Sequence, residues 1–536
     1  MGLPWKWVLS LGFASLCLIY ITVKVLDVLW WKPRKIEQQF AKQGIRGPKY
    51  HFFIGCVKEM IALMVEASSK PPQPHNYHNI LPRVLPFYSH WKKIYGPTFL
   101  IWFGPTPRIA ISDPELIREV LLSRSEYFDR YESHPLIRQL EGKGLVSLRG
   151  EKWAHHRKVL TPTFHMDNLK LLVPYIGKTI KDMVEKWKDM CDTGSSSCGE
   201  VEIDVSEWLQ IVTEDAITRT AFGRSYEDGK AVFQLQTQLM AFASEAFRKV
   251  FIPGYRFIPT KKNASSWKLD KEIKKTLVRL IGRRSTEDYE KPDANSSVKD
   301  LLGLMINAST NLKANKHPVE PITVLDIVEE CKTFFFAGKQ TTSNLLTWAT
   351  VLLAMHPNWQ ERARQEVLEV CGSELPNKDH LFKLKTLGMI LSETLRLYPP
   401  AVATIRRAKA DVELGGHMIP RDTELLIPIM ALHHDRDQWG PDVAQFNPAR
   451  FADGIARAVK HPTAYIPFGL GARMCIGQNL AILEAKLTLA IILQNFTFRV
   501  SPKYVHSPTV LMLLYPQYGA PVIFRPIKSQ PSDCQL

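Results

Sequence analysis

The first residues of the chain form a long apolar segment. Residues 7–23 contain no charged side chain, and beyond Lys24 a second apolar stretch runs to Trp31. A helix that crosses a bilayer needs about 17–25 mostly apolar residues, a lysine near its end can reach the headgroups, and tryptophan favours the interface. The alternative is a cleaved signal peptide, but the segment is long for one and no small-residue cleavage site follows it. We therefore expect residues 1–31 to be an N-terminal membrane anchor.

Basic side chains gather on the C-terminal side of this segment. Only Lys6 precedes the apolar run, whereas it is followed by Lys24, Lys32, Arg34 and Lys35. Lysine and arginine near a spanning helix tend to stay in the cytosol, so the bulk of the chain is expected to face the cytosol. Residues 32–48, which end in a stiff Arg-Gly-Pro turn, predict a basic, proline-containing linker.

Helical periodicity dominates the rest of the chain. Residues 322–355 predict one long helix, apolar on much of its circumference and ended by Pro357, which is typical of a helix buried at the centre of a fold. Residues 384–397 predict another helix, and short alternating segments after residue 401 predict small strands. The expected fold is a single large, mostly α-helical domain with small β-sheets over residues 49–530, followed by a tail over residues 531–536.

Composition and charge narrow the function classes. Hydrophobic residues make up 45% and charged residues 23% of the chain, which excludes a wholly disordered or a polytopic membrane protein. The 69 basic and 53 acidic residues give a net charge of +16, which suits nucleic acid, an anionic membrane surface or an acidic protein partner. No known nucleic-acid-binding module is recognisable, so we expect no nucleic-acid partner and favour membrane lipid and a protein.

One of the eight cysteines stands out. None forms a CxxC pair, so a cysteine-built zinc site is not expected. Cys475 lies in a glycine-rich loop, FGLGARMCIG over Phe468 to Gly477, directly before a predicted helix. Glycines permit close backbone approach to a ligand, and both a helix N-terminus and the nearby Arg473 favour a thiolate. Such a loop suits a metal with a single protein ligand, whereas the other seven cysteines are interpreted as small buried hydrophobes.

The segment FGLGARMCIG resembles the FxxGxRxCxG haem-binding signature of the cytochrome P450 family at every fixed position. Glu393 to Arg396 resembles the ExxR helix of that family, Pro448 to Phe451 its PxRF segment, and Trp153 with Arg157 its WxxxR helix. The resemblance covers nearly the whole chain, anchor included. It implies the cytochrome P450 fold and haem b (iron protoporphyrin IX), with Cys475 as the axial ligand whose electron density favours O–O cleavage.

The resemblance also implies roles for other residues. Residues expected around the haem and its propionates are Trp153, Arg157, Arg406, Phe468, Gly469 and Arg473. Glu393 and Arg396 are i,i+3 neighbours on a helix and, with Arg450, are expected to form a buried structural triad. The alternative for the helix pair is a solvated contact worth a few tenths of a kcal/mol.

Residues 337–342, AGKQTT, resemble the family's oxygen-side segment [AG]Gx[DE]T[TS]. The small Ala337 and Gly338 are expected to leave room for oxygen, and Thr341 is the expected catalytic residue, bonding to dioxygen. The alternative for Thr341 is a hydrogen bond back to the carbonyl four residues earlier. Gln340 replaces the usual acid and receives no general-acid role, because a neutral amide can orient water but does not supply protons as a carboxyl group does.

Residues 334–357 closely resemble plant enzymes of the clan 72 type that inactivate brassinosteroids by C-26 hydroxylation. The resemblance implies a steroid substrate and a role in hormone homeostasis. Alternatives are oxidation of a gibberellin, cytokinin or fatty acid, an oxygen-independent haem-thiolate isomerase, and a non-catalytic haem sensor. A weaker prediction, since any helical core is lined in this way, is a substrate pocket with Phe335, Ala337, Val402, Ala403, Thr404, Val510 and Leu511.

Electrons must come from another protein, because the chain has no flavin or nicotinamide fingerprint. The resemblance implies O2 as co-substrate and an NADPH-cytochrome P450 reductase as the electron donor. It also implies a single-pass protein of the endoplasmic reticulum membrane whose catalytic domain faces the cytosol. Cations expected to flank the reductase-docking side are Lys152, Lys158, Arg473 and Lys486.

Overall fold

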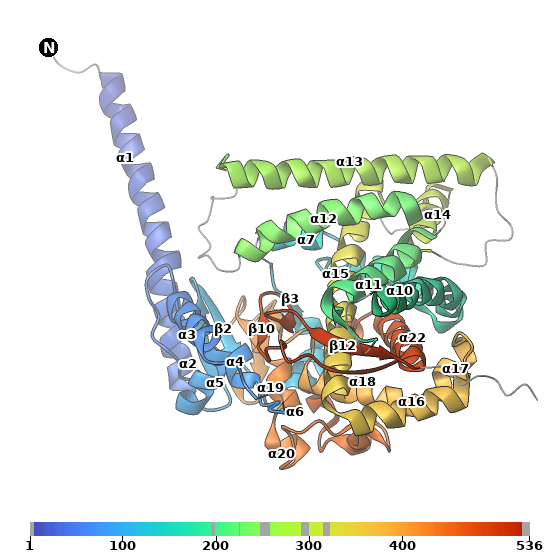
Figure 1. Ribbon diagram of the computed structural model, residues 1–536. Coiled ribbons are helices and arrows are strands. Elements are labelled where there is room, and N and C mark those ends of the chain that lie inside the picture. The colour runs from blue at the N-terminus through green and yellow to red at the C-terminus, as the bar shows by residue number, and fades with distance from the viewer. Residues whose placement is uncertain are drawn as a thin grey trace, which may run out of the picture. The chain divides into compact units, whose positions relative to one another are not determined.

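The computed structural model describes residues 5–74, 76–133, 135–193, 199–223, 226–246, 258–290, 300–314 and 322–527. It is mostly helical with small β-sheets (Figure 1), which confirms the predicted fold class. The chain divides into two compact units: unit 1 comprises residues 1–70, 81–131 and 403–428, and unit 2 comprises residues 71–80, 132–402 and 429–536. The tail predicted over residues 531–536 lies outside the described residues, and the domain boundaries stay a prediction.

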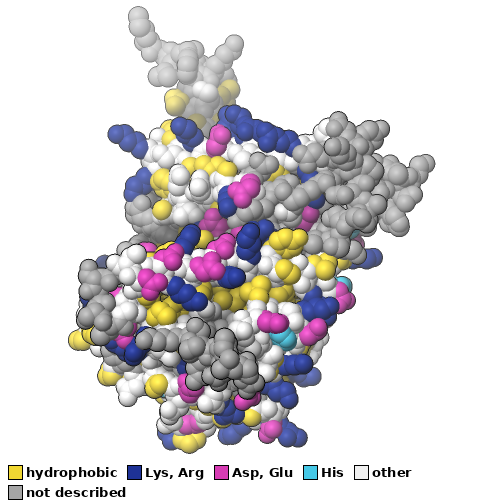
Figure 2. All heavy atoms as spheres, turned by 45° about the vertical axis from the view of Figure 1, so that its right-hand side comes forward, with side chains coloured by type: hydrophobic (Ala, Val, Ile, Leu, Met, Phe, Trp, Pro, Cys, Tyr) yellow, Lys and Arg dark blue, Asp and Glu magenta, His cyan; other side chains and the backbone are white. Residues whose placement is uncertain are grey.

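Charges of both signs are mixed on one face of the molecule. On the face seen in Figure 2, lysine and arginine side chains alternate with acidic ones and with apolar areas. The net charge of +16 is therefore not concentrated there in a field of one sign.

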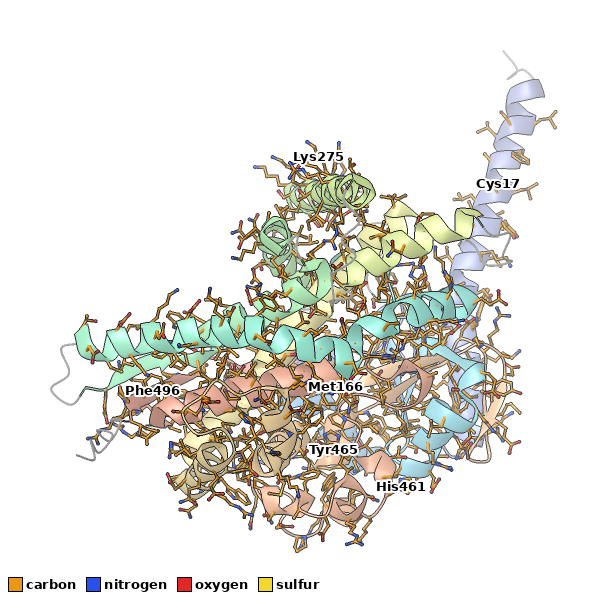
Figure 3. All side chains as sticks on the ribbon, turned by 90° about the vertical axis from the view of Figure 1, so that its right-hand side faces the viewer. Cys17, Met166, Lys275, His461, Tyr465 and Phe496 are labelled. Atoms are coloured by element: carbon orange, nitrogen blue, oxygen red, sulfur yellow. The ribbon has the colours of Figure 1, made fainter. Side chains whose placement is uncertain are left out.

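Unit 1 begins with helix α1 (Trp5–Leu26), which continues through a π-helical turn (Asp27–Trp31) into α2 (Lys32–Lys42). Among the described residues, Leu9–Lys42 is the one helix long and apolar enough to cross a membrane, and none of its most apolar window is buried. In Figure 3 the side chains of α1, Cys17 among them, project outward from the helix. The helix has the length and composition of a membrane anchor, and the first part of the predicted linker is helical.

The base of this long helix packs against the rest of unit 1. Phe40 is buried, the Tyr50 phenol donates a hydrogen bond to the Leu29 carbonyl, and the ring centroids of Trp30 and Tyr50 are 6.3 Å apart. After α2 the chain turns at Gly47, where an added Cβ would lie 1.7 Å from the Leu100 carbonyl oxygen. Only glycine fits at this turn, since the chain passes directly over strand β1 (Phe99–Phe103). The remaining helices of unit 1 are α3 (Val57–Ser69), α4 (Leu81–Val84), α5 (Pro86–Tyr95) and α6 (Pro114–Arg118).

The five-stranded sheet of unit 1 has the order β1-β2-β8-β5-β3. Only β2 and β8 are parallel, and a buried Arg108–Glu424 ion pair of 2.6 Å joins them. The sequence predicted the strands after residue 401 but not their partners, because partners far apart in the chain leave no local signal. The strands are β1 (Phe99–Phe103), β2 (Thr106–Ala110), β3 (Phe128–Arg130), β5 (Thr404–Ala408) and β8 (Glu424–Ile427), beside the hairpin β6 (Val412–Leu414) and β7 (His417–Ile419).

Helix α15 (Val324–Met355) runs through the core of unit 2 and confirms the long helix predicted over residues 322–355. A capping box of Thr323 and Asp326 begins it, and His356 ends it before Pro357. It packs closely on α11 (Val205–Phe222), where a Cβ on Gly338 would lie 2.5 Å from Ile217 Cγ1. A glycine at position 338 therefore allows α11 to approach α15 closely, and the expected room for oxygen stays a prediction.

The other elements of unit 2 surround this helix. A three-stranded sheet has the order β4-β12-β9, and β10 pairs with β11. The helices are α7 (Pro135–Glu141), α8 (Gly150–Leu160), α9 (Met166–Leu169), α10 (Val173–Thr193), α12 (Tyr226–Ala246), α13 (Lys261–Glu290), α14 (Leu301–Ala314), α16 (Pro357–Cys371), α17 (Lys378–Lys383), α18 (Lys385–Leu397), α19 (Ile429–His433), α20 (Arg436–Trp439), α21 (Ile455–Ala458) and α22 (Gln478–Asn495). The strands are β4 (Val201–Asp204), β9 (Phe496–Val500), β10 (Pro508–Val510), β11 (Leu514–Pro516) and β12 (Pro521–Pro526).

Unit 2 buries several neutral histidines. His78 Nδ1 lies 2.7 Å from the Tyr398 hydroxyl, and burial lowers the pKa of His78 to about 3. The backbone N–H of Ile466 donates to His433 Nε2 (3.1 Å), and burial lowers the pKa of His433 to about 3. His434 contacts the Leu397 carbonyl at 2.9 Å, and burial lowers its pKa to about 4. In the folded state these rings are neutral near pH 7.

We predict that acid destabilises the fold. An unfolded histidine takes up a proton near its ordinary pKa of 6.5, whereas these rings resist protonation until about pH 3–4. The unfolded state therefore binds more protons than the folded state as the pH falls below 6.5. Each histidine then lowers the free energy of unfolding by up to about 1.4 kcal/mol per pH unit. Thermal unfolding measured between about pH 7 and 5 should show a falling midpoint, less steep in His434→Gln. A midpoint that stays level over this range would contradict the prediction.

Candidate functional site

Backbone contacts hold the loop that carries Cys475. The Cys475 N–H donates to the Phe468 carbonyl (2.8 Å), and the Met474 N–H donates to the Gly471 carbonyl (2.9 Å). Gly469 and Gly471 adopt φ angles of 77° and 75°, a left-handed conformation that favours glycine. The predicted helix after the loop is α22. The loop therefore sets the position of the sulfur through the main chain.

The groups around Cys475 shift the pKa of its thiol in opposite directions. Part of the residue is open at the surface of the loop, yet the atoms packed around it raise the pKa of the thiol, chiefly by burial. The Gly477 backbone N–H and the charge of Arg157 lower it to a smaller extent. Arg157 is therefore a cation that acts on the sulfur, and the helix after the loop begins at Gln478.

Trp153, Arg157 and Arg473, all expected at the haem propionates, meet at this loop, and the propionate role itself stays a prediction. Both Trp153 and Arg157 lie on α8, and Arg157 Nη1 donates to the Met474 carbonyl at 2.9 Å. The Arg473 guanidinium stacks on the Trp153 ring, 4.1 Å from its centroid. One thiol with two guanidinium groups is a donor set that fits haem, which needs one axial ligand and cations for two propionates.

One stretch of helix α15 is less buried than the residues on either side of it. Residues 336–341 are half-buried, whereas Phe335 before them and Thr342 after them are buried. The Thr341 hydroxyl donates to the Ala337 carbonyl (2.7 Å), the alternative that the sequence left open. Its oxygen retains acceptor capacity, because a hydroxyl has two lone pairs. The Gln340 amide donates to Asn344 Oδ1 at 3.2 Å, which sets its direction.

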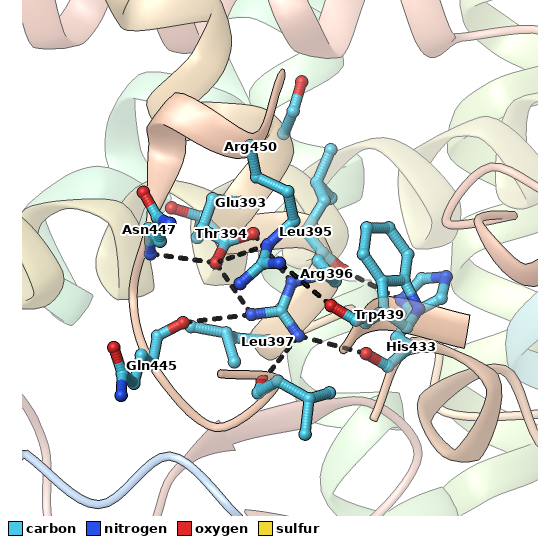
Figure 4. A network of polar contacts seen from close by, with 12 residues as sticks. Glu393, Thr394, Leu395, Arg396, Leu397, His433, Trp439, Gln445, Asn447 and Arg450 are labelled. Carbon is cyan, nitrogen blue, oxygen red and sulfur yellow. Dashed lines mark hydrogen bonds and ion pairs between the residues drawn. The ribbon is translucent and has the colours of Figure 1, made fainter. Parts of the chain in front are cut away.

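The predicted buried triad is present and larger than expected (Figure 4). The Arg396 guanidinium donates to both Glu393 carboxylate oxygens at 2.7 Å, and both side chains are fully buried. Arg450 Nε lies 3.7 Å from Glu393 Oε1, an ion pair without a hydrogen bond. The closer partner of Arg450 is Asp442, at 2.7 Å. Asp442 was missed by sequence reasoning, because it stands outside the PxRF segment and nothing in its local pattern marks it.

The Arg396 side chain also binds backbone. It donates to the carbonyls of His433 (3.1 Å), Val443 (2.8 Å) and Gln445 (3.1 Å). The Asn447 N–H in turn donates to Glu393 Oε1 at 3.0 Å. The ion pair thus organises the irregular segment before the cysteine loop, in agreement with a structural role.

The weaker pocket candidates are spread over both units. In unit 2 the Phe335 ring is enclosed by Phe233 and Phe222, with ring centroids 4.1 and 5.1 Å away, so it contributes to an aromatic cluster of the core. Val402 is buried, and Val510 and Leu511 are half-buried at the β10 end of the β10–β11 hairpin. The pocket role of these residues, and of Ala337, stays a prediction.

Three predicted site residues belong to unit 1: Ala403, Thr404 and Arg406. Arg406 is buried on β5, and its Nη1 donates to Thr404 Oγ1 (2.9 Å) and the Ile405 carbonyl (3.1 Å). The neighbouring Arg407 instead pairs with Asp422 at 2.8 Å. The two arginines thus have different partners, and the propionate role of Arg406 stays a prediction.

Comparisons with known proteins agree with these motifs. The sequence profile of the family described as Cytochrome P450 matches residues 81–523. Cytochrome P450 734A6 of Oryza sativa subsp. japonica is 73% identical over 523 residues, 96% of each chain. Cytochrome P450 734A1 of Arabidopsis thaliana is 64% identical over 519 residues, 95% of this chain and 96% of the relative. Cytochrome P450 72A397 of Kalopanax septemlobus is 42% identical over 502 residues, 93% of this chain and 94% of the relative.

We predict that Glu393→Gln strongly destabilises unit 2. The substitution leaves the buried Arg396 guanidinium without its counter-charge, and breaking a buried pair in this way costs about 3–5 kcal/mol. Chemical denaturation measures the loss. The matched control is Asp453→Asn in the exposed Arg457–Asp453 pair (3.9 Å), whose removal should change the free energy of unfolding by less than about 0.5 kcal/mol. Equal small effects in both variants would contradict the structural role of Glu393.

Proposed function

The chain belongs to the cytochrome P450 family, a family of monooxygenases, and from this premise we propose that it is a membrane-anchored haem-thiolate enzyme that hydroxylates a steroid. The more specific proposal is C-26 hydroxylation of a brassinosteroid, which would inactivate the hormone. The single observation that carries the proposal is the convergence of Trp153, Arg157 and Arg473 on the loop of Cys475. The likeness of residues 334–357 to brassinosteroid-inactivating enzymes supports the substrate class.

The residues at the loop have the chemistry to hold haem b. Cys475 would hold the iron through its sulfur, and the guanidinium groups of Arg157 and Arg473 would bind the carboxylates, with the Trp153 ring keeping Arg473 in place. When bound, the haem supplies the redox chemistry that activates O2 and places one of its atoms in a C–H bond. The protein contributes binding, orientation and the control of protons.

Proton control would fall to the half-buried stretch of α15. The Thr341 hydroxyl, donating to the Ala337 carbonyl, presents its oxygen as an acceptor for a water molecule or a bound ligand. Gln340 is held by Asn344 and, as a neutral amide, can orient water without giving up a proton. Thr341 and ordered water would therefore carry the proton, in place of the usual acid.

The membrane and the electron donor complete the proposal. The apolar helix would anchor the chain in the endoplasmic reticulum membrane, with the catalytic part in the cytosol beside an NADPH-cytochrome P450 reductase. Four cations are expected on the side that would bind the reductase. Of these, Lys158 is exposed, Lys152 pairs with Asp326 at 2.7 Å, and Lys486 donates to the Leu381 carbonyl at 3.0 Å. Lys158 and the half-exposed Lys152 are the better candidates for an acidic partner.

We predict that Cys475→Ser abolishes the strongly red-shifted carbon monoxide spectrum of thiolate-bound haem, because a serine hydroxyl does not supply a thiolate. The matched control is Cys371→Ser at the buried end of α16, which should keep the spectrum. Absorption of the reduced, carbon monoxide-treated proteins measures both. Persistence of the red-shifted band in Cys475→Ser would show that another residue is the ligand.

The substrate proposal predicts a product. The full-length protein, reconstituted with the reductase and NADPH in lipid vesicles, should convert castasterone and brassinolide to products heavier by one oxygen atom, hydroxylated at C-26. Mass spectrometry and fragmentation identify the position, and Cys475→Ser is the inactive control. Turnover of a gibberellin, cytokinin or fatty acid in preference to either steroid would overturn the substrate assignment while keeping the enzyme class.

A further inference from the structure

An ion pair and a histidine–carboxylate hydrogen bond join α8 to α15 at matched positions. Lys152 Nζ lies 2.7 Å from Asp326 Oδ1, and His156 Nδ1 lies 2.6 Å from Glu330 Oε1. The partners are four residues apart on each helix, so both pairs lie on one face of α8 and one face of α15. This spacing fixes both the rotation of α8 and its position along α15.

The inner pair is the more constrained of the two. The His156 and Glu330 side chains are 2% and 0% exposed, whereas Lys152 is 45% exposed. The second carboxylate oxygen of Glu330 accepts the Leu145 N–H at 2.8 Å, and a Cβ on Gly144 would lie 2.5 Å from it. Both oxygens of Glu330 therefore have partners. A buried pair of this kind is weak evidence of stability, and its best-attested use is to fix register.

The register of α8 matters because of the residues that follow the two pairs. Trp153 comes directly after Lys152, and Arg157 comes directly after His156, so each is turned by about 100° from its neighbour around the helix. On that side Trp153 stacks on Arg473, and Arg157 binds the Met474 carbonyl. A slip of one residue would move the helix by about 1.5 Å, turn it by about 100°, and take both side chains from the cysteine loop.

We propose that His156 and Glu330 are positioning residues that set the register of α8, so that Trp153 and Arg157 are presented to the carboxylates of the haem. Neither residue is assigned to the haem itself by the family motifs. The inference rests on the proposed haem site. Glu330, on helix α15, would hold α8 through His156 and would also hold the turn at Leu145 that precedes α8.

The test measures haem retention separately from stability. Transfer of haem to apomyoglobin and the carbon monoxide spectrum are recorded for full-length wild type, His156→Ala, His156→Gln and Glu330→Gln, with the thermal midpoint of each. The matched control is Asp300→Asn, which breaks the buried Arg284–Asp300 pair (2.7 Å) between α13 and the start of α14. Glutamine at either position retains hydrogen-bonding groups, so these variants also test the inference if His156→Ala does not fold.

His156→Ala should lose haem about tenfold faster than wild type, the effect typical of removing a residue that orients a ligand-binding side chain. The glutamine variants should lose haem more slowly than His156→Ala, and Asp300→Asn should keep the wild-type rate despite a lower midpoint. Wild-type haem loss in all His156 and Glu330 variants, or loss that simply follows the midpoint in every variant, would overturn the inference. If wild type itself lacks the thiolate spectrum, the proposed function fails instead.

Discussion

The candidate site depends on one constraint: a single sulfur must be held at a fixed point by the main chain. In the part of the chain that the structure describes, Cys475 belongs to no cluster of three or more metal-binding side chains, and its position is set by the Phe468 carbonyl and by left-handed glycines at Gly469 and Gly471. The loop can hold the sulfur in one place only if the segments before and after it are themselves fixed. The rest of unit 2 supplies that restraint on one side through buried polar contacts and on the other through α22.

The buried polar contacts form a continuous series from α18 to the loop. Arg396, paired with Glu393, binds the His433 carbonyl, and the His433 ring accepts the N–H of Ile466. The Ile466 carbonyl in turn accepts the N–H of Gly469, at the first turn of the loop. Tyr465, labelled in Figure 3, adds a hydrogen bond from its hydroxyl to the Ser392 carbonyl on α18. An ion pair far from the sulfur is thereby connected to it, and each member has a partner, as a buried network requires.

The parts of this arrangement that the sequence could predict are those that a local pattern determines. Residues 322–355 show their helix by apolar periodicity over most of their length, and Cys475 shows its loop by glycines and arginine at fixed spacing. Pairing across the chain leaves no such pattern. The β1–β3 partners of the later strands, Asp442 beside Arg450, and Glu330 beside His156 all became visible only when the fold brought them together. For the same reason the sequence could not show that Gly338 packs against Ile217, which is distant in the chain.

Helix α15 combines close packing in the core of unit 2 with one half-buried stretch, residues 336–341. Its three polar residues there each have a partner: Lys339 pairs with Glu214 at 2.7 Å, Gln340 donates to Asn344, and Thr341 donates to Ala337. Asn344 is buried and its Nδ2 has no hydrogen-bond partner in the described part of the chain, so a carboxylate in place of Gln340 would meet a donor there but no counter-charge. In the proposed function, the neutral Gln340 therefore leaves proton control to the Thr341 hydroxyl and to water.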